Sequence, residues 1–170
     1  MTIDIFLDRD GTLINDTGYI SNPTDVRILP SVVEGLKLFT LNNYRLHIVS
    51  NQSGVGRGII SPAKFSSVEA RVSLLFLEEG VVFDSINYCF HVPDDDCHCR
   101  KPRTGLFESV SSRFQINKES TVLIGNSGSD QGAALNYGIL YWGINPTELN
   151  SFYRCAEEIV VYFAGKSDAL

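Results

Sequence analysis

The chain has 170 residues, an apolar share of 44% and a formal net charge of −6 from 14 basic and 20 acidic residues. This length allows a substantial buried core, and we expect residues 1–170 to form a single domain. No run of about 18 apolar residues is present, which argues against a membrane-spanning helix. The basic residues are scattered along the sequence, which argues against a nucleic-acid partner because such partners require a basic face.

The first eight residues lack the charged head and cleavage site of a signal peptide. We therefore expect a cytoplasmic protein with no membrane partner. A monomer is the expected oligomeric state.

Strand-like and helix-like segments alternate along the chain. Residues 3–8 are a short apolar run that ends at a cluster of charge and glycine, as is typical of a buried strand. Further strands are predicted over residues 45–50, 84–89, 121–125 and 139–144. Helices are predicted after a capping box at Ser31, from the Ser61-Pro62 pair to Gly80, after Thr104, and over residues 129–137 and 152–164.

This alternation predicts an α/β fold with three layers, a Rossmann-like parallel sheet with helices on both faces. In such sheets, ligands bind beyond the carboxyl ends of the strands. Four strand ends therefore deserve inspection, namely those at Asp8, Ser50, Cys89 and Gly125.

The first strand ends in two acids, Asp8 and Asp10, separated by one residue and followed by Gly11. Two carboxylates this close repel each other unless a cation or a shared proton relieves them. A hard cation such as Mg²⁺ suits oxygen ligands. Asp-x-Asp-Gly also occurs in turns and calcium loops, and the preceding apolar strand favours the site at a sheet edge.

Two further segments carry groups suited to an anion. The loop after the second strand, residues 50–58, contains a hydroxyl, two side-chain amides and three glycines that could surround an oxyanion. Later, Arg100 and Lys101 form a pair of cations before a proline. Each segment alone could equally be solvated surface.

A cysteine cluster follows the third strand. Its ligands, Cys89, His91, Cys97 and Cys99, make a complete tetrahedral set for structural zinc. Close spacing with an interleaved histidine favours metal over disulfides, and buried free thiols are the alternative. The remaining residues of these types are not expected to be ligands: His98 should point outward, His47 should be a packed or edge histidine, and Cys155 should be buried.

Taken together, these motifs resemble the haloacid dehalogenase superfamily of aspartyl-phosphate phosphatases over residues 3–143. Residues 6–13, 50–54 and 99–102 are similar to the group that holds D-glycero-D-manno-heptose 1,7-bisphosphate phosphatases and histidinol-phosphate phosphatases. The resemblance implies a phosphoric monoester hydrolase with a haloacid-dehalogenase-like fold and a zinc-binding loop. The expected partner is a small phosphorylated sugar or similar metabolite.

The resemblance also implies a role for each motif. Asp8 would be the nucleophile and Asp10 the acid–base, while Ser50 and Lys101 would hold the phosphoryl group. The family's substrate-contacting segments align with Asp16, Tyr19, Asn51, Gln52, Ser53 and Arg100. The Mg²⁺ ligands would come from Asp8, Asp10 and the residue after Gly125.

That last residue departs from the family pattern, which has an acid there and a second acid four residues later. Here the sequence has Asn126, with Asp130 as the surviving acid and a further candidate for the Mg²⁺ site. An amide oxygen can bind a hard cation but brings no negative charge. A weakened or inactive homologue that only binds a phosphorylated ligand is therefore an alternative.

The features that bear on substrate disagree. Residues 15–20 and 52–58 look like the heptose bisphosphate enzymes. The spacer of five residues between His91 and Cys97 looks like the histidinol-phosphate enzymes. We favour D-glycero-D-manno-heptose 1,7-bisphosphate, since the first two segments touch substrate in the family, with histidinol phosphate as the alternative.

Overall fold

The computed structural model describes residues 2–167. Its five strands form one parallel sheet in the order β3 (Ser85–Cys89), β2 (Arg45–Asn51), β1 (Asp4–Leu7), β4 (Thr121–Gly125) and β5 (Leu140–Gly143). The predicted parallel sheet is confirmed. Because β1 is central, its carboxyl end meets those of β2 and β4 at one edge of the sheet.

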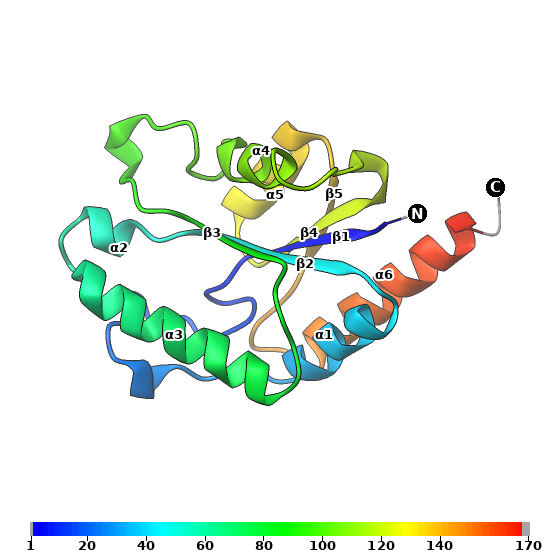
Figure 1. Cartoon of the computed structure of the whole chain (residues 1–170), viewed down its shortest axis with the longest axis horizontal. Helices are drawn as coiled ribbons and strands as arrows, with labels where there is room; N and C mark the ends of the chain where they lie inside the picture. Colours follow the sequence, from blue (N-terminus) through cyan, green and yellow to red (C-terminus); the bar gives the residue numbers. More distant parts are fainter. Residues whose placement is uncertain (1, 168–170) are drawn as a thin grey trace.

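Helices cover both faces of the sheet, which confirms the predicted layers (Figure 1). One face carries α1 (Val32–Leu41), α3 (Pro62–Glu78) and α6 (Ser151–Ser167). The other carries α4 (Gly105–Ser111) and α5 (Gly128–Tyr137). The connections add the short helix α2 (Ser53–Gly56) and the 3₁₀ turns η1 (Pro23–Asp25), η2 (Pro93–Asp95) and η3 (Lys118–Ser120).

Side chains of the central strand alternate between two hydrophobic cores. Ile5 and Leu7 pack in the core beneath α1, α3 and α6, whereas Phe6 packs in the core beneath α4 and α5. Successive residues of a strand point to opposite faces, so a strand covered on both sides must be apolar throughout. This explains why residues 5–7 of β1 are all apolar and why the first acid of the site, Asp8, comes directly after the strand.

The helix starts agree only partly with the sequence expectation. Ser61 caps α3 as predicted, and its hydroxyl accepts from the Lys64 amide at 3.3 Å. The capping box predicted at Ser31 is wrong: Ser31 has a φ of 62° and its hydroxyl accepts from the Tyr153 amide of α6 instead. A capping box that the sequence reading missed, from Ser127 to Asp130, begins α5.

A chain of buried polar side chains crosses the sheet at the far end from β1's carboxyl terminus. His47 is fully buried, which agrees with the packed alternative, and lies 3.0 Å from the Asp4 carboxylate and 2.9 Å from the Ser85 hydroxyl. Arg45 donates two bonds to Asp4, at 2.7 and 2.9 Å. Burial disfavours the charged form of Asp4, but the bonds from His47 and Arg45 outweigh it and lower the pKa of Asp4.

Within residues 2–167, no helix combines the length and apolar character needed to cross a bilayer.

Candidate active site

A cavity of about 260 Å³ lies beyond the carboxyl ends of β1, β2 and β4. It is lined by every residue that the sequence analysis assigned to catalysis, substrate or Mg²⁺: Asp8, Asp10, Asp16, Tyr19, Ser50, Asn51, Gln52, Ser53, Arg100, Lys101, Asn126 and Asp130. These residues come from five separate segments of the chain. The topology gathers them because parallel strands end at the same edge.

Lys101 is the buried cation at the base of this cavity. Its ammonium lies 2.8 Å from Asp8 Oδ1 and 2.6 Å from Asp130 Oδ1, and donates to the Val49 carbonyl at 2.7 Å. The Lys101 side chain is only 1% exposed. Two carboxylates thus share one cation in a site with little water, where charge interactions are strong.

The protonation of this group follows from its surroundings. Burial alone would lower the pKa of Lys101, but Asp8 and Asp130 outweigh it and raise the pKa, so the ammonium stays charged. Burial raises the pKa of Asp8, and Lys101 opposes that rise. A second cation close to Asp8 would favour its ionised form further.

The two carboxylate oxygens of Asp130 differ, because Oδ1 forms an ion pair with Lys101 but has no hydrogen-bond partner in the part of the chain described. Oδ1 faces Lys101, and Oδ2 accepts from the Ser127 amide at 3.1 Å and the Ser127 hydroxyl at 2.5 Å. The same side chain therefore caps α5 and supports the lysine.

Asn51 lines the cavity but holds a neighbouring segment. Its amide nitrogen donates to the Lys101 carbonyl and its amide oxygen accepts from the Lys101 amide, both at 3.0 Å. Both ends of the Asn51 side chain are thus bonded to the backbone that carries the lysine. Such a reciprocal pair fixes where the Lys101 side chain begins.

The loop after β1 brings Asn126 close to the paired aspartates. Gly11 has a φ of 73°, and a Cβ at this position would lie 2.3 Å from the Asn126 amide nitrogen. A larger residue here would be strained at this φ and would have to displace the Asn126 side chain. Asn126 Oδ1 accepts from the Thr12 hydroxyl at 3.4 Å. The amide therefore lies over the turn that follows the nucleophile candidate.

The sequence reading missed Arg9, the residue between the two aspartates. Its side chain is 2% exposed and is bonded to Asp10, Gln52 and Glu69. A charged residue in the middle of an Asp-x-Asp motif could have been flagged, because the apolar strand before it predicts a buried surrounding. Glu69 lies on α3 beside its apolar face, and nothing in the sequence pairs it with Arg9.

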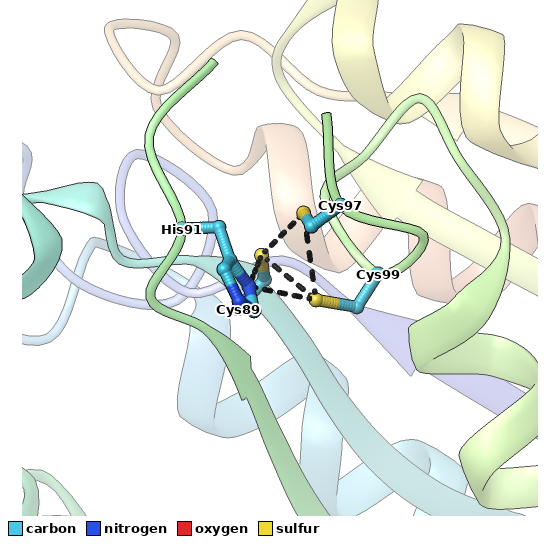
Figure 2. A group of neighbouring side chains, drawn as sticks. All are labelled: Cys89, His91, Cys97 and Cys99. Carbon is cyan, nitrogen blue, oxygen red and sulfur yellow. Dashed lines mark hydrogen bonds between the residues drawn. The ribbon is translucent and has the colours of Figure 1, made fainter. Parts of the chain in front are cut away.

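The four predicted zinc ligands converge at the loop after β3, as Figure 2 shows. Sulfur–sulfur distances are 3.1 Å for Cys89–Cys99 and 3.7 Å for Cys89–Cys97 and Cys97–Cys99. His91 Nδ1 lies 3.6 Å from the Cys89 sulfur and 3.3 Å from the Cys99 sulfur. Tetrahedral zinc with bonds of about 2.3 Å to sulfur requires sulfur–sulfur edges of about 3.8 Å.

The sulfur–sulfur distances would need to lengthen only slightly to hold a zinc ion. The protonation of Cys89 also favours a cation at this cluster. Burial raises the pKa of the Cys89 thiol to about 12. A metal ion would be needed to hold it as a thiolate at neutral pH. His98 points outward as predicted: its side chain is 72% exposed and lies 2.6 Å from Glu108. Cys155 is buried as predicted.

Comparison with known proteins agrees with this geometry. Residues 3–142 match the sequence model of the family described as polynucleotide kinase 3 phosphatase. A probable D-glycero-D-manno-heptose-1,7-bisphosphate 7-phosphatase of Thermoplasma volcanium is 38% identical over 128 residues, covering 75% of this chain and 88% of the relative. The D-glycero-β-D-manno-heptose-1,7-bisphosphate 7-phosphatase of Vibrio cholerae is 34% identical over 142 residues, covering 79% and 76%.

A solved structure is similar over nearly the whole chain. The D,D-heptose 1,7-bisphosphate phosphatase from B. bronchiseptica, complexed with magnesium and phosphate, superposes with a TM-score of 0.85 at 25% identity, covering 94% of this chain and 99% of that one. The fold and the paired aspartates with their buried lysine define a phosphatase of the haloacid dehalogenase superfamily. Within it, the chain belongs to the polynucleotide kinase 3 phosphatase family, in the group that holds the heptose bisphosphate phosphatases.

Proposed function

We propose that the protein hydrolyses D-glycero-D-manno-heptose 1,7-bisphosphate at its 7-phosphate, through a phosphoryl group carried transiently on Asp8. The observation that supports this reaction class is the buried ion pair between Asp8 and Lys101, whose charged atoms lie 2.8 Å apart. Asp10 lines the same cavity. The substrate rests on the relatives, which are named as 7-phosphatases of this bisphosphate.

In the first step, Asp8 attacks phosphorus. Lys101 holds Asp8 Oδ1, so Oδ2 is the oxygen that forms the new bond. As the ester P–O bond breaks, Asp10 gives its proton to the leaving sugar oxygen. In the second step, water attacks the phosphorus and passes a proton to Asp10, and the bond between Asp8 and phosphorus breaks. Inorganic phosphate leaves with all atoms accounted for.

Side chains that are already held in place by the fold would offset the negative charge of the transferred phosphoryl group. Lys101 lies where the phosphoryl oxygens of a bound ester would come, and Asp130 and Asn51 hold it there. Ser50 is buried on the same wall and offers a hydroxyl. Such prearranged groups supply most of the catalysis in phosphoryl transfer.

The donors around Asp8 fit Mg²⁺, because they are all hard oxygens. Asp8 and Asn126 would contribute side-chain oxygens and Asp10 its backbone carbonyl. The bound cation would offset the negative charge of the phosphoryl group. Asp130 Oδ1 pairs with Lys101 and has no hydrogen-bond partner among the described residues, so Asp130 would support the cation directly or through water.

Structural zinc belongs to the same proposal. Cys89, His91, Cys97 and Cys99 would hold it, and the last of them directly precedes Arg100 and Lys101. Pinning this loop would fix the start of the segment that delivers both cations to the cavity. We also propose that residues 1–170 act as one domain.

Histidinol phosphate is the second candidate substrate, favoured by the short spacer between His91 and Cys97. Phosphate release with Mg²⁺ from the heptose bisphosphate, from histidinol phosphate and from simple sugar phosphates separates the candidates. We expect kcat/KM for the heptose bisphosphate to exceed the others by at least about tenfold, since a site that pairs polar substrate groups rejects analogues lacking them. A preference for histidinol phosphate would transfer the assignment to that substrate. Tight phosphate binding without turnover of any ester would indicate an inactive homologue.

A further inference from the structure

The Arg9 side chain lies against two aromatic rings, Phe65 and Tyr88, which also contact each other with ring centres 5.1 Å apart. Its guanidinium carbon is 5.6 Å from the centre of the Phe65 ring and 5.5 Å from that of the Tyr88 ring. The side chain is 2% exposed. A buried cation is costly unless anionic partners and hydrogen bonds compensate it. The groups that Arg9 binds therefore indicate its role.

The principal partner is Asp10. Arg9 Nε donates to Asp10 Oδ1 at 3.1 Å, and Arg9 Nη2 donates to Asp10 Oδ2 at 3.0 Å. Two parallel bonds from one planar guanidinium fix the plane of a carboxylate as well as its position. A lysine in place of Arg9 would bring the charge without this fork.

Gln52, the residue that follows β2, bonds to both side chains of this pair. Its amide oxygen accepts from Arg9 Nη2 at 2.8 Å, and its amide nitrogen donates to Asp10 Oδ2 at 2.5 Å. Among the described residues, Asp10 Oδ2 thus accepts two side-chain bonds and Oδ1 accepts one. Oδ1 therefore keeps more lone-pair capacity for a proton.

We propose that Arg9 is a positioning residue for the acid–base Asp10, which it holds by the fork so that Oδ1 exchanges the proton in both steps. The inference rests on the proposed function. In the first step the proton leaves Oδ1 for the departing ester oxygen, and in the second Oδ1 takes a proton from the attacking water. Arg9 itself touches neither the phosphorus nor the reacting oxygens.

A purely structural role is the competing explanation, because Arg9 also pairs with Glu69. Its Nη1 lies 3.4 Å from Glu69 Oε2, and the Tyr88 hydroxyl donates to the same oxygen. If Arg9 served only to link α3 to the sheet, its loss would reduce the folded fraction and leave turnover per folded molecule unchanged. The test must therefore measure rates per active site.

The decisive experiment uses Arg9→Met with two substrates. On the heptose bisphosphate we expect kcat to fall at least about 30-fold with KM changed less than about threefold, a substantial part of what acid–base catalysis contributes. On p-nitrophenyl phosphate the leaving group needs no proton, so only the second step should slow. A burst of nitrophenol equal to the amount of folded enzyme should then precede a slower steady rate.

Two further variants serve as controls. Arg9→Lys keeps a cation but loses the fork, and we expect a kcat between those of the unaltered protein and Arg9→Met. Arg45→Met removes another arginine that donates two bonds to a buried aspartate, at the opposite end of the sheet. It should lower thermal stability and leave kcat per folded molecule unchanged. Arg9→Lys also keeps the test open if Arg9→Met does not fold.

The outcomes separate the inference from the function beneath it. A full kcat in Arg9→Met, or in Arg9→Lys if that is the only folded variant, would overturn the positioning role while the phosphatase assignment stands. A lower burst amplitude with an unchanged rate per folded molecule would do the same. An unaltered protein that releases no phosphate from any ester would overturn the proposed function and this inference together.

Discussion

Lys101 serves two acids at once, and this sharing makes it the residue on which the site's electrostatics depend. Its ammonium nitrogen lies 2.8 Å from Asp8 Oδ1 and 2.6 Å from Asp130 Oδ1. Neither acid has another cation within salt-bridge distance in the part of the chain described. Removing the lysine would leave two buried carboxylates next to each other.

We therefore expect Lys101→Met to lower kcat by about 100-fold to 1,000-fold, as the loss of one preorganised charge-stabilising group does. The free energy of unfolding at pH 7 should also fall, by about 3 kcal/mol, because breaking a buried ion pair leaves an uncompensated charge. Steady-state kinetics and urea unfolding measure the two effects. Lys37→Met, which breaks an exposed pair with Glu79, is the matched control and should change neither appreciably.

Asn126 is the residue that distinguishes this site from the family pattern. Its oxygen can reach a hard cation, but the amide supplies no charge to offset the cation's dehydration. We expect Asn126→Asp to tighten Mg²⁺ binding and to raise activity at limiting Mg²⁺. A Mg²⁺ titration of phosphate release for both proteins tests this. Unchanged half-saturation and unchanged rate would mean that the metal is held by other residues.

At the scale of elements, the loop from β3 to α4 links the four candidate zinc ligands to Lys101, the proposed catalytic cation. Cys89 ends β3, and Cys99 stands two residues before Lys101. The loop contains one short 3₁₀ turn, Pro93–Asp95, so few backbone bonds hold it. Its order should therefore depend on the metal.

Purified protein should contain about one zinc per chain without added metal. Cys97→Ser should lose most of it, lower the melting temperature and reduce kcat, because the segment that carries Lys101 loosens. Metal analysis and thermal unfolding with and without a chelator measure these changes. Cys155→Ala is the control, since Cys155 lies on the buried face of α6 and its replacement should leave the zinc content unchanged. Zinc-free, fully active protein would refute the assignment.

The buried Asp4 carboxylate, with its two partners Arg45 and His47, gives the sheet a pH-dependent contribution to stability. The folded-state pKa of Asp4 lies below its ordinary value of 3.8. The unfolded state therefore binds more protons near that pH, so this contribution is present above pH 4 and is lost as pH falls through the lower folded pKa.

Asp4→Asn should accordingly lower the free energy of unfolding at pH 7 by about 3 kcal/mol. The difference between the variant and the unaltered protein should shrink as the pH falls from about 4 toward 2. Urea unfolding across this range measures it, with Glu79→Gln at an exposed ion pair as control. A difference that stays constant with pH would show that ionised Asp4 contributes nothing.

For the molecule as a whole, the sequence predicted the layers of the fold and the position of the site. It did not predict the contacts between side chains within the site. Apolar runs and helical spacing are local properties, so the parallel sheet and the edge that carries Asp8 followed from them. Side-chain directions depend on packing between distant segments. The sequence therefore did not reveal that Arg9 turns toward Asp10, nor that Asn51 clamps the backbone of Lys101. It also placed a capping box at Ser31, where contact with α6 determines the local conformation.

The central claim is that Asp8 removes the 7-phosphate of the heptose bisphosphate, and phosphorus NMR of a reaction with Mg²⁺ tests it most directly. The spectrum resolves both phosphate esters and inorganic phosphate at once. We predict that the 7-phosphate signal decays into inorganic phosphate while the 1-phosphate signal persists. Asp8→Asn, of nearly equal volume, should remain folded and leave both ester signals unchanged. Phosphate release by Asp8→Asn at a rate near that of the unaltered protein would contradict the account.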